Sequence, residues 1–331
     1  MAVRIVGTGK YIPPGFETTA TVAERLGLST EDILHKTGIE KRHLAGDESA
    51  SSMAHKALES AITKSGIAKD EIDGVIVATF TGDYLYPSTA LKLVQTLGLK
   101  AGIAFDLMAN CAGMQVAMEN ARCLLQGNPS LRVIAVVGLA KQSPFVDPFD
   151  ENSAYFFGDA ASVVLLRRSE AEAEAGGLMP SYFTSNTKNY EVVRLRGGGS
   201  SFPHSPALFE QDSKALYYEH TGLGVWKEVV VELPKIIRRA MDDLGWTVND
   251  LDLILFHQAN LRLIEYCMAR LRVPMSKTIN NVQQIGNTAE ASLGTVMDEA
   301  FDAGWFAPGK KVLLASVGAG FVYTATPYYI P

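Results

Sequence analysis

The sequence is poor in cysteine, carries no excess of basic charge and contains no long apolar run. Its three cysteines (Cys111, Cys123 and Cys267) form no CxxC pair, which argues against a disulfide framework and against a zinc site. A net charge of −6 argues against a molecule that binds nucleic acid or is basic over its whole surface. No stretch of about 18 apolar residues is present, so we expect no membrane span. The first residues lack the apolar core of a signal peptide, and a reducing cytoplasm is the simplest expected setting.

What is present is an ordinary globular composition, with 47% hydrophobic and 20% charged residues. Within it, two stretches resemble each other, 57–80 and 237–258. Each reads as an amphipathic helix stopped by a glycine, then an acidic connector, then an apolar strand. The spacing from Gly66 to Asp73 equals the spacing from Gly245 to Asp252.

A second pair, 132–138 and 311–318, occurs at nearly the same offset, and each member reads as a buried strand ending in glycine. Although helix–glycine–strand units are common, two matches in register favour an internal duplication with halves 1–170 and 171–331. Alternation of helices and strands predicts an α/β fold with mostly parallel, helix-covered sheets.

Two further segments carry local predictions. The first residues predict a strand that enters a glycine turn at 7–9. The segment 170–215, with its Ala/Glu repeats and a Gly-Gly-Gly-Ser-Ser run, predicts a strand and a long surface loop, either solvated filler or the rim or lid of a site.

The most informative residue is Cys111, in the segment FDLMANCAGMQ (105–115). An apolar run precedes it and a helical pattern follows, which predicts a strand, a short bend and a helix that opens at the cysteine. A helix N-terminus favours the thiolate, the form that attacks carbonyl carbons. By itself, however, a lone cysteine among small apolar residues is more typical of core packing.

Two polar residues later in the chain are candidates for partners of Cys111. His257 directly follows a buried-strand pattern, where ligands gather in open α/β sheets, and Asn260 lies just beyond it. Asn287 follows Gly286, which permits a tight bend. Taken singly, His257 reads as a hydrogen-bonded structural histidine and Asn287 as a helix N-cap.

The segment Gly318-Ala319-Gly320 also follows a strand, and its backbone N–H groups are able to face an oxyanion, although a tight turn explains it equally well. Together these candidate residues are suited to one reaction, the condensation of two thioesters. Cys111 takes an acyl group from a thioester, and two neutral donors, His257 and Asn287, hold the carbonyl oxygen of a second thioester. Loss of CO₂ then gives an enolate, which each donor stabilises by about 3 kcal/mol. Its carbon attacks the acyl-cysteine.

These residues and their order resemble the β-ketoacyl-acyl carrier protein synthase III family, condensing enzymes with the thiolase fold. The similarity runs nearly end to end, and the order Cys, HQAN-R, GNT, G-x-G is highly specific. The matching segments are GTGKYIP (7–13), KTGIEKRHLA (36–45), the Cys111 segment, FGDAASVVLL (157–166), HQANLR (257–262), IGNTAEAS (285–292) and SVGAGF (316–321).

The resemblance implies two duplicated halves in a five-layer αβαβα core, a homodimer, and a Cys111–His257–Asn287 triad. It implies an oxyanion hole made by the backbone N–H groups of Cys111 and Ala319. No cofactor or metal is expected, only thioesters linked to phosphopantetheine. It further implies contacts to the substrate or to acyl carrier protein by a group of residues near the site, namely Arg262, Lys227, Asn260, Lys36, Gly318 and Gly320. Tyr86 aligns with a residue that crosses the dimer interface and closes the partner's acyl pocket.

The chain departs from the family where coenzyme A is bound. Asp32 stands in place of a tryptophan and Glu151 in place of an arginine, the two side chains that sandwich the adenine, whereas Lys36 keeps a basic residue in place of a further arginine. Two acids repel the phosphates of the nucleotide. We therefore expect a carrier-bound or non-standard acyl donor rather than a plain acyl-CoA.

Two other reactions on the same fold remain as alternatives. An acyltransferase passes the acyl group to a hydroxyl or amine, but relatives of that kind tend to carry aspartate at the position of Asn287. A condensation without decarboxylation, head-to-head or pyrone-forming, needs a base near Cys111. Glu119 is on the following helix, and its position predicts a surface residue instead.

Overall fold

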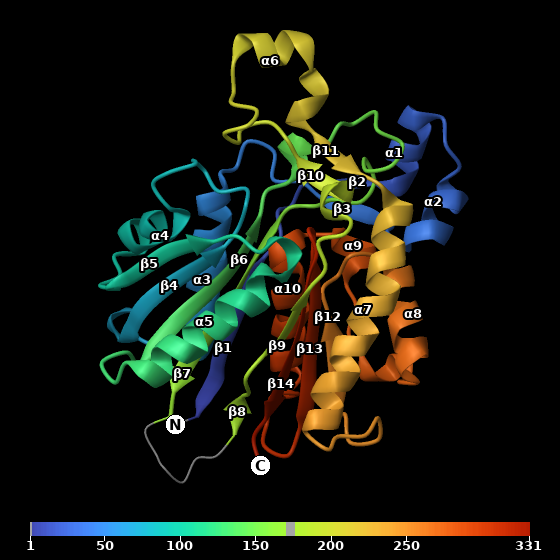
Figure 1. The fold of residues 1–331 in the computed structure, drawn as a ribbon. Helices are drawn as coiled ribbons and strands as arrows, with labels where there is room; N and C mark the ends of the chain where they lie inside the picture. The colour runs from blue at the N-terminus through green and yellow to red at the C-terminus, as the bar shows by residue number, and fades with distance from the viewer. Residues whose placement is uncertain (1, 170–175) are drawn as a thin grey trace.

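The structure, a computed structural model, describes residues 2–169 and 176–331 as two five-stranded sheets with helices between and outside them (Figure 1). The first sheet has the strand order β1-β7-β6-β4-β5, and the second has the order β12-β13-β14-β8, with β9 paired to β14. The strands of the first sheet are β1 (Val3–Tyr11), β4 (Ile72–Ala78), β5 (Ile103–Leu107), β6 (Val133–Ala140) and β7 (Ala160–Arg168). Those of the second are β8 (Gly177–Leu178), β9 (Tyr182–Ser185), β12 (Leu253–Phe256), β13 (Lys311–Gly318) and β14 (Val322–Tyr329).

The helices occupy three layers around these sheets. Helices α5 (Gly113–Gly127) and α10 (Ala289–Asp302) lie between the sheets, and nearly every residue of α10 is buried. Helices α3 (Ala50–Ser65) and α4 (Thr89–Leu97) cover the outside of the first sheet, and α7 (Gly222–Asp243) and α8 (Leu261–Leu271) cover the second (Figure 1). The expected five-layer αβαβα fold is therefore confirmed. The prediction of mostly parallel sheets is wrong, because β7 pairs antiparallel with β1 and β6, and β14 pairs antiparallel with β13, β8 and β9.

Most of the smaller elements lie at one end of the two large sheets (Figure 1). Two two-stranded sheets pair β2 with β3 and β10 with β11. The strands are β2 (Phe16–Thr18), β3 (Lys41–His43), β10 (Val193–Leu195) and β11 (Tyr218–His220), and the short helices are α1 (Thr19–Leu26), α2 (Thr30–Thr37), α6 (Pro206–Gln211) and α9 (Val282–Ile285).

The two sheets repeat one pattern, as the sequence similarity indicated. Strand β4 pairs in parallel with β6, and β6 pairs antiparallel with β7; strand β12 pairs in parallel with β13, and β13 pairs antiparallel with β14. The predicted boundary between the halves, at 170/171, lies outside the described residues, as do most of the Ala/Glu repeats that follow it.

Capping residues explain where several of these helices begin and end. In α3 the Ser49 hydroxyl accepts the Ser52 N–H at 3.2 Å, and Gly66 closes the helix with a left-handed φ of 70°. A non-glycine residue would be strained at that φ. The predicted glycine stop at this position is therefore confirmed.

The predicted glycine turn at 7–9 is wrong, because β1 continues through both glycines to Tyr11. A Cβ on Gly9 would lie 2.5 Å from the Ala61 backbone nitrogen, so the missing side chain lets α3 pack directly on β1. Likewise β6 does not end at Gly138 but runs on to Ala140, and a Cβ on Gly138 would lie 2.3 Å from the Glu290 carbonyl oxygen. Both glycines permit close helix–sheet contact rather than a turn.

The segment predicted as a strand and a long loop holds more regular structure than expected. It contains β9, β10 and α6, and α6 lies far from the two large sheets (Figure 1). Val193 of β10 lines the main cavity of the site, so part of the segment forms its rim.

Candidate active site

One cavity of about 560 Å³ brings together side chains from four distant parts of the chain. Cys111, His257, Asn287 and Ala319 all line it. Each of these residues follows the end of a strand or precedes a central helix, so the two-sheet fold places all four beside one cavity. The convergence expected from their order in the sequence is therefore present in the structure.

The Cys111 turn is held by backbone features on both sides. After β5, a short 3₁₀ turn (Asn110–Ala112) carries the cysteine, and α5 begins at Gly113. Asn110 has a left-handed φ of 48°, and its side-chain amide donates to the Ala319 carbonyl at 2.8 Å. A Cβ on Gly318 would lie 2.4 Å from the Ala109 carbonyl oxygen. Glycine is thus required where the end of β13 meets the nucleophile turn.

The prediction that the helix N-terminus favours a Cys111 thiolate is wrong for the resting enzyme. The cysteine keeps part of its surface in the cavity, but protein atoms surround the sulfur. Burial raises the pKa of the Cys111 thiol, the nearby Glu290 carboxylate raises it further, and only the Cys111 backbone N–H lowers it. The helix also begins two residues later than predicted, which weakens its effect on the sulfur. Burial therefore disfavours the thiolate in the resting site.

His257 directly follows β12, and its backbone N–H continues the sheet by donating to the Ala315 carbonyl at 2.8 Å. Burial lowers the pKa of His257 to about 3, so the ring is neutral. Its Nδ1 lies 2.5 Å from the Ser292 hydroxyl oxygen, which also accepts the Gln258 N–H at 3.2 Å. Donation of the hydroxyl proton to Nδ1 leaves Nε2 with the ring proton, as a neutral hydrogen-bond donor.

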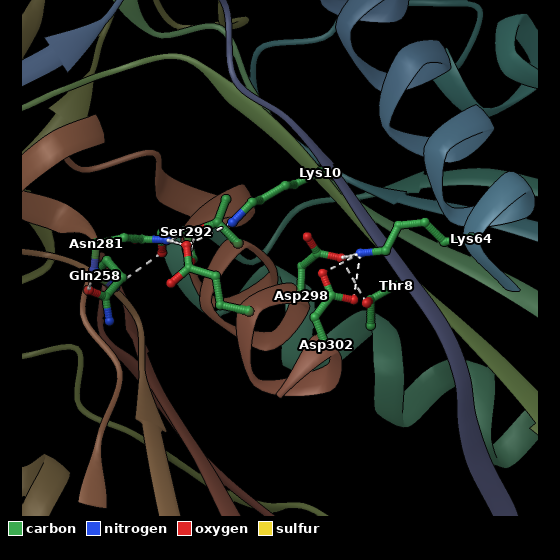
Figure 2. A network of polar contacts seen from close by, with 10 residues as sticks. Thr8, Lys10, Lys64, Gln258, Asn281, Ser292, Asp298 and Asp302 are labelled. Atoms are coloured by element: carbon green, nitrogen blue, oxygen red, sulfur yellow. Dashed lines mark hydrogen bonds and ion pairs between the residues drawn. The ribbon is translucent and has the colours of Figure 1, made fainter. Parts of the chain in front are cut away.

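A polar network continues from Gln258, the residue that follows His257 (Figure 2). The Gln258 side-chain oxygen accepts the Asn281 N–H at 3.2 Å, and the Asn281 amide donates to Glu299 at 2.9 Å. Lys10 of β1 donates to the same Glu299 oxygen at 2.7 Å. Asp298, directly before Glu299 on α10, accepts from Thr8 at 2.8 Å and from Lys64 at 2.7 Å. The network ties α10 and the histidine loop to the first sheet and α3.

Asn287 lies just before α10, and its role is not that of the N-cap, which is Thr288. The Asn287 side-chain oxygen accepts the Ala289 N–H at 3.0 Å, which leaves the NH₂ group as the part available to a ligand. Its backbone N–H donates to the Phe156 carbonyl at 2.8 Å, and its carbonyl oxygen accepts from the Gly158 N–H and from Gln142 Nε2, each at 2.9 Å. Asn287 and His257 thus present two neutral donors to one cavity.

Ala319, which has a glycine on each side, lines the same cavity as His257 and Asn287. Its carbonyl oxygen is turned toward the Asn110 amide. Gly320 has a φ of 123°, a backbone conformation that side chains rarely adopt. The predicted oxyanion hole of the Cys111 and Ala319 N–H groups therefore has its two residues side by side, and its role stays a prediction.

The predicted carrier-contact residues lie around the mouth and on the outer helices. Asn260 and the exposed Lys36 line the cavity, and the Asn260 side chain also caps α8 by accepting the Leu263 N–H at 2.8 Å. Lys227 is exposed on α7. Arg262 is engaged, because it donates to the His35 and Leu34 carbonyls of α2 and pairs with Glu265 at 2.9 Å.

Three other residues singled out in the sequence lie outside the cavity. Tyr86 is 86% exposed in the loop between β4 and α4. Asp32 and Glu151 are both exposed. The prediction of Glu119 as a surface residue is wrong, because its carboxylate is largely buried against Arg122 and also accepts from the Ser181 N–H and hydroxyl at 3.1 Å.

Sequence reasoning missed several residues of the site. Ser292 and Glu290 both lie within the quoted IGNTAEAS segment, where an acid between two alanines on a central helix was the available signal. Trp226 of α7 lines the cavity, and Tyr218 of β11 packs behind it on Phe157. These two come from a short strand and an outer helix whose placement no local pattern indicated.

Within the described ranges, no cluster of three or more His, Cys, Asp or Glu side chains is placed to hold a metal ion. No helix among those residues combines the length and the apolar character that crossing a bilayer requires.

Comparison with known proteins gives one consistent result. Residues 105–187 match the model of 3-oxoacyl-[acyl-carrier-protein] synthase III, and residues 241–330 match the model of its C-terminal part. The chain is 33% identical to β-ketoacyl-[acyl-carrier-protein] synthase III of Phocaeicola vulgatus over 97% of this chain and 94% of that one. It is 31% identical to the enzyme of Erythrobacter litoralis over 97% of both chains.

Solved structures agree with the sequence relatives. The 3-oxoacyl-(acyl carrier protein) synthase III of Pseudomonas aeruginosa superposes with a TM-score of 0.89 at 28% identity, covering 100% of this chain and 99% of that one. The priming β-ketosynthase of the R1128 polyketide pathway superposes with a TM-score of 0.87 at 26% identity, covering 100% and 96%. With the full-length match to curated relatives above 30% identity, this chain belongs to the β-ketoacyl-acyl carrier protein synthase III family of condensing enzymes.

Proposed function

We propose that this enzyme, an acyltransferase of the ketosynthase III type, joins a Cys111-bound acyl group to a malonyl-type thioester with loss of CO₂, in fatty acid or polyketide biosynthesis. The observation that carries the proposal is the single cavity lined by Cys111, His257 and Asn287. A nucleophile and two neutral donors are what such a condensation requires.

In the first half-reaction the Cys111 sulfur attacks the carbonyl carbon of an acyl thioester. The thiol proton leaves with the departing thiol, and the acyl group stays on the enzyme as a thioester. The backbone N–H groups of Cys111 and Ala319 stabilise the negative oxygen of the tetrahedral intermediate. Because burial raises the pKa of Cys111, the sulfur must give up its proton in the course of the attack.

In the second half-reaction a malonyl thioester binds with its carbonyl oxygen between His257 Nε2 and the Asn287 NH₂ group. The bond to the carboxylate breaks, CO₂ leaves, and the electron pair forms an enolate whose oxygen the two donors hold. The enolate carbon attacks the acyl-cysteine carbonyl, and the Cys111 thiolate departs and takes up one proton from solvent, which restores the thiol. A neutral His257 suits this role, because burial lowers its pKa to about 3 and a donor suffices.

The test separates the two half-reactions. His257→Ala and Asn287→Ala should still acquire an acyl mass on Cys111, whereas decarboxylation of malonyl-carrier should fall about 10²–10³-fold in each, or about 3 kcal/mol. Acylation is measured by mass spectrometry and decarboxylation by released CO₂, with Cys111→Ala as the control that cannot be acylated. If either variant lost acylation of Cys111 while it still decarboxylated malonyl-carrier, the assigned roles would be overturned.

The partners proposed for this site are acyl carrier protein and thioesters linked to phosphopantetheine. Lys36 at the cavity mouth supports binding of an anionic arm, whereas exposed Asp32 and Glu151 disfavour the coenzyme A nucleotide. We therefore propose a carrier-bound acyl donor. Faster loading of Cys111 from acyl-CoA than from the matched acyl carrier would contradict this.

We also propose a cytoplasmic homodimer that acts without nucleic acid or membrane. The loop before α4 exposes three large apolar side chains in a row, Tyr84, Leu85 and Tyr86, at 72%, 85% and 86%. Such a patch is typical of a protein interface. Sedimentation of the purified chain as a monomer at micromolar concentration would contradict the dimer.

A further inference from the structure

Gln142 is a buried side chain that binds the segment carrying Asn287 without reaching the cavity itself. It lies just after the end of β6 and is 1% exposed. Its Nε2 donates to the Asn287 carbonyl oxygen at 2.9 Å and to the Gly158 carbonyl oxygen at 3.0 Å. Because Gln142 does not line the cavity, any effect that it has on the reaction must pass through the residues that it holds.

The Asn287 segment runs beside the chain that leads into β7. The Asn287 N–H donates to the Phe156 carbonyl at 2.8 Å, and the Asn287 carbonyl accepts the Gly158 N–H at 2.9 Å, which makes a parallel bridge between Phe157 and Asn287. The two carbonyl oxygens that share the Gln142 amide therefore belong to neighbouring segments. A single NH₂ group joins the two segments at this point.

Two glycines bring the surrounding backbone into direct contact with this bridge. A Cβ on Gly158 would lie 2.4 Å from the Ile285 carbonyl oxygen. Gly286 has a left-handed φ of 80°, and a Cβ placed there would lie 2.8 Å from Arg42 Cβ. No flexible side chain separates these segments, so a shift of the Gly158 segment moves the backbone of Asn287 as well.

The position of Gln142 is itself fixed by a buried carboxylate. Asp159 is 0% exposed and accepts the Gln142 N–H at 2.7 Å, the Ser143 N–H at 2.9 Å and the Ala45 N–H at 2.8 Å. The Ser143 hydroxyl donates to it at 2.6 Å. Its own N–H donates to the His43 carbonyl at 2.8 Å. A buried polar network whose members are bonded in this way holds one arrangement.

The orientation of Asn287 matters for only one half of the proposed reaction. Its NH₂ group is the donor offered to the enolate oxygen, and a donor acts fully only where the charge develops. A misplacement of about 1 Å is able to cost about 10²-fold in rate. Among the described residues, none of the hydrogen bonds that Gln142 makes reaches the Cys111 turn.

We propose that Gln142 is a positioning residue for decarboxylation, whose amide fixes the Asn287 backbone so that the Asn287 NH₂ group faces the malonyl carbonyl oxygen. This inference rests on the proposed function, because it concerns the second half-reaction. Without the amide, the buried carbonyl groups of Asn287 and Gly158 lose their shared donor and repel each other, and the Asn287 segment shifts away from its active position.

The first test is Gln142→Met, which keeps a side chain of similar length but removes both N–H donors. The kcat for decarboxylation of malonyl-carrier should fall about 10–100-fold, with KM and the rate of Cys111 acylation unchanged. Released CO₂ is measured with radiolabelled malonyl-carrier. Each rate is divided by the fraction of Cys111 that mass spectrometry shows to be acylated, which counts only correctly folded enzyme.

Gln115→Met is the matched control. Gln115 is 0% exposed, and its Nε2 likewise donates to two acceptors, the Leu314 carbonyl at 3.1 Å and the Thr326 hydroxyl at 2.8 Å, away from Asn287. It should lower the thermal stability, yet leave the ratio of decarboxylation to acylation unchanged. If Gln142→Met does not fold, Gln142→Asn replaces it, because an amide one methylene shorter is unable to bridge both carbonyl groups.

A double variant separates positioning from a general structural role. If Gln142 acts only through Asn287, then Gln142→Met added to Asn287→Ala should slow decarboxylation no further. A further tenfold loss in that background would overturn the proposal. Equal slowing of both half-reactions in Gln142→Met, or the same selective loss in Gln115→Met, would overturn it too. A wild type that acylates Cys111 but releases no CO₂ would remove the proposed function together with this inference.

Discussion

At the scale of single residues, the state of the Cys111 proton is set by its surroundings rather than by its place near a helix. Burial and the Glu290 carboxylate both raise the pKa of the thiol. A raised pKa means that the thiolate fraction, and with it the rate of attack on an alkylating agent, is small at neutral pH and grows as the pH rises.

We predict that alkylation of Cys111 by iodoacetamide is at least tenfold slower at pH 7 than that of an unperturbed cysteine of pKa about 8.5, and still accelerates above pH 9. The measurement uses a Cys123→Ser background, because Cys123 is exposed. Cys111→Ala in that background measures any remaining reaction at Cys267. A rate that levels off below pH 8 would show that the helix N-terminus dominates after all.

Ser292 is a positioning residue, because it acts on substrate only through His257. Its hydroxyl lies 2.5 Å from His257 Nδ1. Ser292→Ala removes the group that keeps the ring proton on Nε2, and we expect decarboxylation to slow about tenfold, or about 1.4 kcal/mol, with Cys111 acylation unchanged. Nitrogen NMR of the His257 ring reads the tautomer directly. A Ser292→Ala variant that decarboxylates more slowly while its His257 ring proton stays on Nε2 would refute this assignment.

At the scale of elements, glycines decide how closely helices approach sheets. A Cβ on Gly9 would lie 2.5 Å from the Ala61 nitrogen and 2.6 Å from the Ala57 oxygen, both backbone atoms that cannot rotate away. Gly9→Ala must therefore push α3 away from β1. We expect the free energy of unfolding to fall by about 1–3 kcal/mol, measured by urea titration.

Gly102 offers the matched control for that substitution. No atom lies within 4 Å of a Cβ placed there, and its φ is not in the left-handed region. Gly102→Ala should change stability by no more than about 1 kcal/mol, and in the stabilising direction, because alanine restricts the unfolded chain. If the two substitutions had equal effects, close helix–sheet packing would not explain Gly9.

At the scale of the whole molecule, the outer helices of the second sheet present charge beside the cavity mouth. Lys227 is exposed on α7, directly after Trp226, which lines the cavity. Arg262, the other predicted contact, already binds α2 and Glu265, so its substitution would disturb the fold as well as the surface. Lys227 is therefore the cleaner probe of carrier docking.

We predict that Lys227→Glu raises KM for malonyl-carrier several-fold, by about 1 kcal/mol, and leaves KM for a small malonyl thioester unchanged. Lys235→Glu is the control, two turns farther along the same helix and paired with Glu232 at the surface. The rise in KM for malonyl-carrier should be smaller at high salt. Equal damage with the carrier and with the small thioester would exclude a docking role for Lys227.

The sequence by itself determined the fold class, the family and the residues that converge. Apolar runs specified buried strands, glycines such as Gly66 ended helices, and Cys111, His257 and Asn287 each followed a strand or a bend. These are local patterns, and the carboxyl ends of parallel strands such as β12 and β13 lie at one edge of a sheet however far apart the strands are in the chain. The order of the motifs therefore sufficed to name the cavity's main side chains.

Only the tertiary structure decided the chemistry around those side chains. Whether Gly9 is a turn or a close contact depends on α3, and whether the Cys111 thiol ionises depends on Glu290 and on burial. The role of the Ser292 hydroxyl depends on its contact with the His257 ring, 35 positions away in the chain. Electrostatics and packing act through space between residues distant in sequence, and no pattern of neighbours along the chain encodes them.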